Sequence, residues 1–305
     1  MNMKKISLQL LSLLLAGAMV FGMAALIFAP IFLIRENTIT ADKDESDEDD
    51  TMEDGGGSEN NAPPSAPDDS ADGTGQDGGS ALPPEEQPEQ TPKSIYIRSL
   101  ADGLSIRSGA GTGYAALGHI NKGDMLHYDG KAGNWYKTIY KNKTAYISAS
   151  SSYTELYELE HGNDDEAIEA VISEGLNLLG FVYVYGAIRL HDGNGNLLSN
   201  FDATKYDCSS LMQYIFYHGA GVNLKMTTRT QVSQGSFVAK SKIARGDLLF
   251  FTNSSRYNKT GVERIGHVAL YLGDNYILHT ASDYAVIEQI SSTRWGYYIE
   301  ARRVY

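Results

Sequence analysis

One cysteine and two histidines further along the chain are the residues whose types and spacing suit nucleophilic catalysis. Cys208 is the only cysteine in the chain, and the pattern around it places it at the start of a helix. The dipole and unpaired N–H groups of a helix N-terminus favour a thiolate, and they can stabilise the oxyanion of a tetrahedral intermediate. We therefore interpret Cys208 as a candidate nucleophile. An inert buried cysteine and a zinc site with two histidines stay open as alternatives, although no fourth zinc ligand is evident.

The two histidines lie on neighbouring expected strands of one hairpin. His267 begins the first strand after a glycine, and His279 lies in the second. If residues 273–275 form a three-residue loop, Ala269 faces His279, and the two histidines become diagonal neighbours on one face, about 7–8 Å apart between Cα atoms. One imidazole could then act as a base while the other orients it. A loop shorter or longer by one residue would place them on opposite faces.

The elements that must position these residues indicate an α+β domain. Apolar residues recur with helical spacing over residues 164–179, after Asn163 or Asp164 as N-cap, and a second helix begins near Asp207. Strands dominate from residue 246 onward. Helices followed by an antiparallel sheet are typical of α+β folds. The expected strands cover residues 247–252, 267–272, 276–281, 286–290 and 298–304.

Residues 94–153 have a different pattern. Short alternating runs are separated by turns that contain glycine, which predicts a small all-β barrel or sandwich. An acidic connector follows this region. The expected strands cover residues 94–97, 104–107, 125–128, 135–139 and 144–147.

The N-terminal third of the chain contains no folded domain by pattern. Residues 6–34 form a run of 29 positions without a charged side chain, preceded by Lys4 and Lys5. A run of this length predicts an uncleaved transmembrane anchor over residues 1–35, with a cytoplasmic N-terminus and the remaining chain outside the cell. Residues 36–93 are expected to be a disordered linker, because their first 57 residues hold 18 Asp or Glu against one Lys.

The distribution of charge excludes one class of partner. The chain has a formal net charge of −13, but the acidic linker accounts for it, and the part expected to fold is nearly neutral. Nothing therefore predicts nucleic-acid binding. No cofactor and no metal are expected either.

The region from residue 164 to 305 resembles the NlpC-type cysteine peptidases of bacterial cell walls, which have a papain-like fold. The matching segments are residues 180–186, 207–209, 229–231, 246–251 and 266–268, together with Gly235 and His279. Residues 94–153 are similar to the bacterial SH3-like domains of cell-wall enzymes, and a modest excess of Lys and Arg there could favour an anionic wall polymer. The SH3 resemblance rests on residues 104–109, 122–124, 134–137 and 145–147.

The resemblance implies roles for six residues. Cys208 would be the nucleophile, His267 the base and His279 the polar residue that orients the base. Tyr183 would line the active site, and Asp207 and Ser209 would help to hold the free amine of an L-alanine in the substrate.

The resemblance also implies a reaction, which is hydrolysis of the bond between γ-D-glutamate and a diamino acid in peptidoglycan stem peptides. This chain departs from the family at three places. Ser210 and Ala187 replace usual glycines, and a side chain at 210 is expected to crowd the cleft. The segment 188–205 is longer than usual and is expected to form a lid or rim loop.

Three functions remain open on the sequence. The first is a peptidoglycan endopeptidase acting through a Cys208 thioester. The second is a wall amidase or acyltransferase that uses the same thiol. The third is a non-catalytic wall-binding protein, although a relative of that kind should have lost Cys208 or His267, and both are present.

Overall fold

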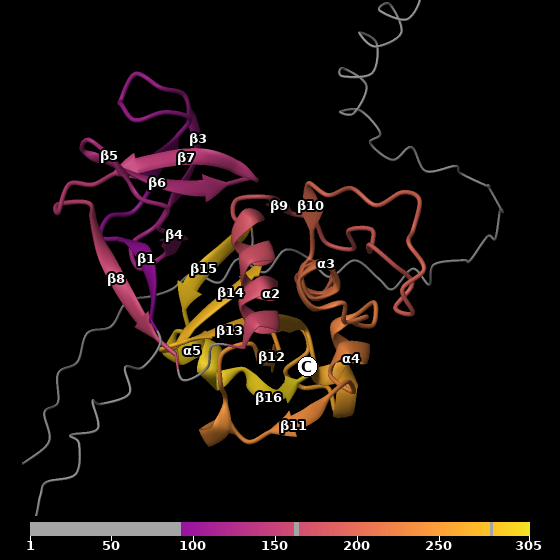
Figure 1. The fold of residues 1–305 in the computed structure, drawn as a ribbon. Helices are drawn as coiled ribbons and strands as arrows, with labels where there is room; N and C mark the ends of the chain where they lie inside the picture. Colours follow the sequence, from indigo (N-terminus) through magenta and orange to yellow (C-terminus); the bar gives the residue numbers. More distant parts are fainter. Residues whose placement is uncertain (1–92, 162–164, 281–282) are drawn as a thin grey trace, which may run out of the picture. The chain divides into compact units, whose positions relative to one another are not determined.

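The computed structural model describes residues 93–161, 165–280 and 283–305 (Figure 1). The expected anchor over residues 1–35 lies outside the described residues, as does the expected linker except for Lys93, which begins the first strand. In the described part of the chain, no helix has the length and apolar character needed to cross a membrane.

A nine-stranded antiparallel sheet runs through the described chain, and helices pack against it, which confirms the predicted α+β architecture. The five strands expected beyond residue 246 all form, with ends within one residue of the prediction. In sheet order the nine strands are β11 (Ser236–Val238), β16 (Tyr298–Arg303), β12 (Leu248–Phe251), β13 (His267–Gly273), β14 (Tyr276–Thr280), β15 (Ala285–Gln289), β4 (Met125–His127), β1 (Lys93–Ser99) and β8 (Thr154–Glu160).

The N-terminal folded region is all-β, as predicted, but its strands are divided between two sheets. Strands β1, β4 and β8 extend the large sheet, because Met125 of β4 pairs with Ile287 of β15. The acidic segment after residue 153 was expected to be a connector; instead it forms β8, which pairs with β1 along its whole length. The second sheet has the order β3 (Ala116–Ile120), β2 (Leu104–Arg107), β7 (Lys143–Ser148), β6 (Trp135–Tyr140) and β5 (Lys131–Ala132).

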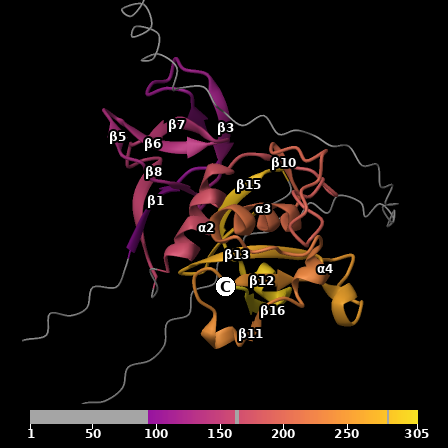
Figure 2. The ribbon, with the colours of Figure 1, turned by 45° about the vertical axis from the view of Figure 1, so that its right-hand side comes forward.

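Helix α2 (Glu166–Asn177) forms where the apolar periodicity predicts it. Its N-cap is Asp165 instead of Asn163 or Asp164, and the Asp165 carboxylate accepts hydrogen bonds from the backbone N–H groups of the first turn. The helix packs against α3 (Cys208–Ala220), as Figure 2 shows. The crossing is close: a Cβ at Gly219 would lie 2.5 Å from backbone atoms of Val171, so only glycine fits there.

Helix α3 begins and ends at well-formed caps. Asp207 is the N-cap, and its carboxylate accepts a hydrogen bond from the Ser210 backbone N–H at 2.7 Å. The helix ends at Gly221, whose φ of 66° is in the left-handed region that favours glycine. Its apolar face buries Leu211 and Ile215 in the main core. The N-terminus of α3, and Cys208 with it, is therefore held rigidly against the sheet.

The hairpin of β13 and β14 has the predicted register. Leu270 pairs with Leu278 and Tyr271 with Ile277, which are the pairs that the three-residue loop implies. The turn is tight, because Asp274 and Asn275 both have positive φ values, and a bulge between Tyr271 and Gly273 takes up the extra residue.

Smaller elements complete the domain. The segment between α2 and α3 contains a short parallel pair of strands, and short helices flank the sheet. These elements are β9 (Val182–Tyr183), β10 (Lys205–Tyr206), α4 (Thr228–Gln231), α5 (Ser292–Gly296) and the 3₁₀ helices at Lys240–Lys242 and Gly261–Arg264.

Candidate active site

Cys208 is the first residue of α3 and faces the start of β13. The residue is only 8% exposed. The backbone N–H groups of Val268 and Ser209 donate toward its sulfur. Val268 directly follows His267 on β13, so the thiol contacts this strand one residue away from the histidine that the sequence pairs with it.

The resting thiol is neutral, in contrast to the thiolate that the helix position predicts. Burial raises the pKa of the Cys208 thiol to about 12, and the negative charge of Asp207 adds to this effect. The N–H groups of Val268 and Ser209 and the charge of Arg189 act in the opposite direction. Loss of water around the sulfur therefore outweighs the helix dipole. Attack by this sulfur requires that a nearby base takes its proton.

His267 and His279 are in contact, as the predicted register requires. His267 Nε2 lies 2.8 Å from His279 Nδ1, and the two rings are nearly perpendicular. Burial lowers the pKa of His267 well below its usual value, and a positive charge on His279 or Arg294 lowers it further. His267 is therefore neutral at rest. Because its Nε2 is engaged with His279, its Nδ1 is the ring nitrogen available to accept a proton.

Two further residues extend this pair of histidines, and sequence reasoning missed both. Glu288 Oε1 lies 3.1 Å from His279 Nε2 and accepts a hydrogen bond from Arg294 Nη2 at 2.7 Å. The His279 contact falls outside the geometry of a well-formed hydrogen bond, so its contribution is mainly electrostatic. Although burial opposes ionisation, His279 and Arg294 lower the pKa of Glu288 to about 2.

We call the row of His267, His279 and Glu288 the relay. The charges around it determine which ring nitrogens carry protons. Burial keeps the pKa of His279 below its usual value despite the nearby Glu288. A neutral His279 with its proton on Nε2, the nitrogen nearer to Glu288, presents Nδ1 as an acceptor. His267 then donates from Nε2 to His279, and its Nδ1 carries a lone pair. This is the tautomer that a base facing the thiol needs.

A signal for Glu288 was present in the sequence. His279 pairs with Val286 on β15, so Glu288 is its diagonal neighbour on the same face. A glutamate directly after three apolar residues of a buried strand is unusual. The diagonal argument that related the two histidines would have found it.

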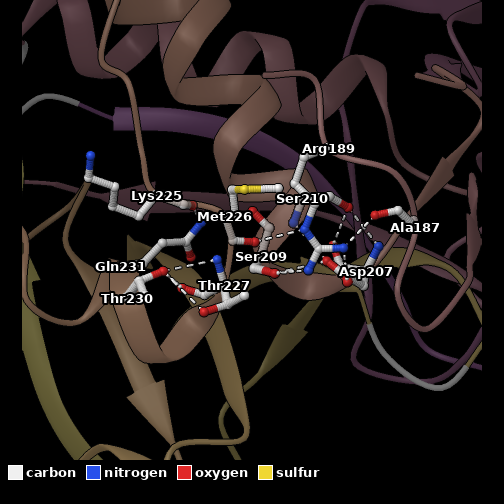
Figure 3. A network of polar contacts seen from close by, with 10 residues as sticks. All are labelled: Ala187, Arg189, Asp207, Ser209, Ser210, Lys225, Met226, Thr227, Thr230 and Gln231. Atoms are coloured by element: carbon white, nitrogen blue, oxygen red, sulfur yellow. Dashed lines mark hydrogen bonds and ion pairs between the residues drawn. The ribbon is translucent and has the colours of Figure 1, made fainter. Parts of the chain in front are cut away.

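On the other side of the thiol, Asp207 and Ser209 are bound by an arginine (Figure 3). Arg189 Nη1 lies 2.8 Å from Asp207 Oδ2, and Arg189 Nη2 donates to Ser209 Oγ at 2.9 Å. Ser209 Oγ also donates to Asp207 Oδ1 at 3.0 Å. Thus Asp207 and Ser209 lie together beside Cys208, but an arginine cation occupies the position predicted for a substrate amine.

Arg189 belongs to the segment 188–205, which the sequence marks as unusually long and which ends at the first residue of β10. The guanidinium is held at its other edge by backbone carbonyls: Nε donates to Met226 O at 2.7 Å and Nη1 donates to Ala187 O. The length of the segment was a signal for a rim loop. Nothing in the pattern showed that one of its residues reaches the helix cap.

The remaining predicted positions are placed as follows. Tyr183 of β9 pairs with Tyr206 of β10, the residue that directly precedes Asp207. The backbone N–H of Tyr183 donates to the Asp283 carbonyl. The expectation that Ser210 crowds the cleft is wrong. Its side chain is fully buried and turns back to the Asp207 backbone, where Oγ accepts from the N–H at 2.8 Å and completes a capping box.

Comparison with known proteins identifies the two folded regions. Residues 180–303 match the NlpC/P60 family model, and residues 102–155 match the bacterial SH3 domain. Residues 180–303 are an NlpC/P60 domain. The cysteine, the two histidines and the Asp207–Ser209 pair all lie within it.

Curated relatives of this NlpC/P60 domain include a protein named as a gamma-DL-glutamyl hydrolase and one named as a peptidoglycan endopeptidase. The chain is 33% identical to the gamma-DL-glutamyl hydrolase of Bacillus subtilis, over 46% of this chain and 30% of that protein. It is 34% identical to the peptidoglycan DL-endopeptidase CwlO of Bacillus licheniformis, over 44% of this chain and 27% of that protein. The chain therefore spans less than a third of the length of these relatives.

A solved structure of an NLP/P60 family protein from Staphylococcus aureus is 29% identical to the chain. The match covers 47% of this chain and 42% of that one, with a TM-score of 0.37.

Proposed function

We propose that the protein is a peptidoglycan hydrolase, a cysteine endopeptidase that cleaves stem peptides between γ-D-glutamate and a diamino acid. The observation that carries this proposal is the row of His267, His279 and Glu288, which begins one residue from Val268, the residue whose backbone N–H contacts the buried Cys208 thiol. The names of the relatives support the substrate class.

In the proposed reaction His267 Nδ1 takes the proton of the thiol while Sγ bonds to the scissile carbonyl carbon. The carbonyl becomes an oxyanion, which backbone N–H groups near the start of α3 stabilise. The His267 imidazolium then gives its proton to the leaving nitrogen, the C–N bond breaks, and a thioester on Cys208 remains. Water attacks the thioester, again losing a proton to His267, and the thiol regains its proton as the new carboxyl group leaves. The net change is hydrolysis of one amide.

The relay lowers the cost of charging His267. Its imidazolium forms in a site that disfavours cations, since burial lowers its pKa. His279 accepts the Nε2–H of His267, and Glu288 supplies a full negative charge behind His279. In this proposal Glu288 and Arg294 are positioning residues, because neither reaches the reacting atoms.

We further propose the setting in which the enzyme acts. The apolar run of residues 6–34 would anchor the chain in the cell membrane, with the catalytic domain on the cell-wall side. The acidic linker would carry that domain to its substrate. The bacterial SH3 region would hold a wall polymer, for which anionic wall polymers are the candidates.

Mass spectrometry of digested peptidoglycan fragments in H₂¹⁸O tests the proposed reaction. Wild-type protein should release fragments that end in γ-D-glutamate with one ¹⁸O in the new carboxyl group, and Cys208→Ala should release none. Cleavage between the lactyl group and L-alanine would identify an amidase instead. A new amide without ¹⁸O would identify an acyltransferase, and absence of any product would favour wall binding alone.

A further inference from the structure

Arg189 is a fixed cation beside the nucleophile. Its side chain is only 13% exposed, and four contacts hold its guanidinium: Met226 O, Ala187 O, Asp207 Oδ2 and Ser209 Oγ. Figure 3 shows the guanidinium directed at Asp207 and Ser209. A planar cation with two carbonyls on one edge and a carboxylate on the other is held firmly in place.

The Asp207 carboxylate already has one cation and two hydrogen bonds, which take three of its about four acceptor sites. Oδ2 is paired with Arg189, and Oδ1 accepts hydrogen bonds from the Ser210 backbone and the Ser209 hydroxyl. An ammonium group at this position would have to displace Arg189 or lie against it. Two like charges in a partly buried site repel each other, and water screens this repulsion only weakly.

The side chains around Arg189 suit a neutral group. Met226, whose carbonyl binds the guanidinium, and Ile188, which directly precedes Arg189 in the chain, are both apolar, at 39% and 46% exposure. Of the five N–H donors of a guanidinium, the four contacts use one from Nε, two from Nη1 and one from Nη2. The second Nη2 hydrogen, next to Ser209, remains for an acceptor such as an amide carbonyl oxygen.

This geometry bears on the amino end of the substrate. In a stem peptide a single L-alanine precedes γ-D-glutamate, so its nitrogen must lie within about 10 Å of the sulfur when the γ-D-glutamyl bond is cut. Ser209 and Asp207 flank Cys208 in the sequence and lie in that range.

We propose that Arg189 makes this enzyme select stem peptides whose L-alanine nitrogen is acylated, as it is when the stem is still joined to the glycan, over released stems with a free amine. The inference rests on the proposed function and adds the state of the substrate's amino end. An acylated nitrogen is uncharged, and its carbonyl oxygen accepts from Arg189. A protonated amine instead meets a guanidinium that already neutralises the Asp207 carboxylate.

The test uses full-length protein and two synthetic stem tripeptides that differ only in N-acetylation of L-alanine. At pH 6.5 the wild type should cleave the acetylated peptide with a kcat/KM at least about tenfold higher. The amine has a pKa of about 8, so the advantage should shrink toward unity as the pH rises to 9. Ionisations of the enzyme cancel in the ratio of the two rates, and this measurement needs no variant.

Variants then assign the effect to Arg189. Arg189→Gln should reduce the preference by about tenfold or more, because Asp207 is freed to hold an ammonium, whereas Arg189→Lys keeps the charge and should keep the preference. Arg302→Gln removes an arginine that pairs with Glu300 on β16, and it should leave the ratio unchanged.

Two results would overturn the inference while leaving the proposed function intact. One is faster cleavage of the free-amine peptide by the wild type at pH 6.5. The other is a ratio that does not change between pH 6.5 and 9. If neither peptide is cleaved at the γ-D-glutamyl bond, the proposed function itself fails, and the inference fails with it.

Discussion

Two arginine–carboxylate pairs flank the active-site thiol, and they do different things with the same chemistry. Glu288 and Arg294 lie behind the histidines, at 2.7 Å. Asp207 and Arg189 lie beside the cysteine, at 2.8 Å. The first carboxylate faces an imidazole, whereas the second caps a helix and is already neutralised by its arginine. The role of an ion pair in this site therefore depends on what the carboxylate faces.

The pairs also differ in how they act on the thiol. The charge of Asp207 raises the pKa of Cys208, and the charge of Arg189 lowers it by less, so that pair acts directly on the thiol. The Glu288 pair acts instead on the base, through His279. The comparison leads us to expect that variants on the base side alter turnover, and that variants beside the thiol alter the choice of substrate.

The largest effect on the base side should come from His267→Ala. Without a group to accept the thiol proton, a thiol with a pKa near 12 stays protonated, and turnover should fall about 10³-fold or more. Steady-state hydrolysis of a stem tripeptide measures the loss. His218→Ala, in the last turn of α3, is the matched control and should stay within about twofold of wild type. Substantial activity in His267→Ala would remove His267 from the mechanism.

Glu288→Gln should have an intermediate effect. It keeps the shape of the side chain but removes the charge that supports His279, so kcat should fall about 10- to 100-fold with little change in KM. Glu300→Gln, which breaks a surface pair with Arg302, is the control. A rise in KM without a fall in kcat would show that Glu288 acts in binding and not on the base.

The pH dependence of kcat/KM tests the state of the base. His267 must be neutral to accept a proton, and burial with the nearby His279 and Arg294 lowers its pKa. Activity should therefore persist below pH 6.5 and decline only as the pH falls through the lowered value. An N-acetylated substrate avoids the titration of the substrate amine. An acid limb centred at or above pH 6.5 would contradict the buried, neutral histidine.

The last prediction concerns stability and the carboxylate of Asp124. This carboxylate accepts a hydrogen bond from a backbone N–H, whereas Glu288 and Asp207 each pair with an arginine. Burial raises the pKa of Asp124 to about 7. The hydrogen bond that its carboxylate accepts from the Asn121 backbone N–H acts in the opposite direction. A raised carboxyl pKa makes the folded state bind the extra proton, so stability should decline as the pH rises from about 4 to 7.

Asp124→Asn should remove this decline. Thermal unfolding of the variant and the wild type at pH 4 and pH 8 measures it, with the Tm gain of the variant larger at pH 8. A gain that is equal at both pH values would mean that Asp124 does not titrate in this range.

The two pairs show why part of the site follows from the sequence. The contact of His267 with His279 was predictable because side chains alternate along strands and the loop length sets the register. Glu288 obeys the same rule and was missed only because the diagonal argument stopped at two strands. Arg189 reaches the helix cap through an irregular segment, and no periodicity relates its position to Asp207.

In the fold, too, the regular elements were predictable from the sequence, whereas features that depend on tertiary contacts were not. Strands beyond residue 246 were predictable to within one residue, and the end of α3 followed from Gly221. Strand β8 was missed because its acidic residues suggested a solvated connector, whereas these residues themselves pair with β1, Glu155 with Arg98 and Glu160 with Lys93. The neutral thiol was missed because burial, which is a tertiary property, outweighs the helix dipole that the sequence reveals.

The central claim is that Cys208 carries the reaction, and stoichiometric alkylation tests it most directly. Cys208 is the only cysteine in the chain, so an iodoacetamide adduct counted by intact-protein mass spectrometry reports this sulfur alone. Residual hydrolysis of a stem tripeptide should equal the unmodified fraction at every time point, and excess substrate should slow the modification. Protein that carries one adduct per chain and still hydrolyses the peptide at the wild-type rate would contradict the account.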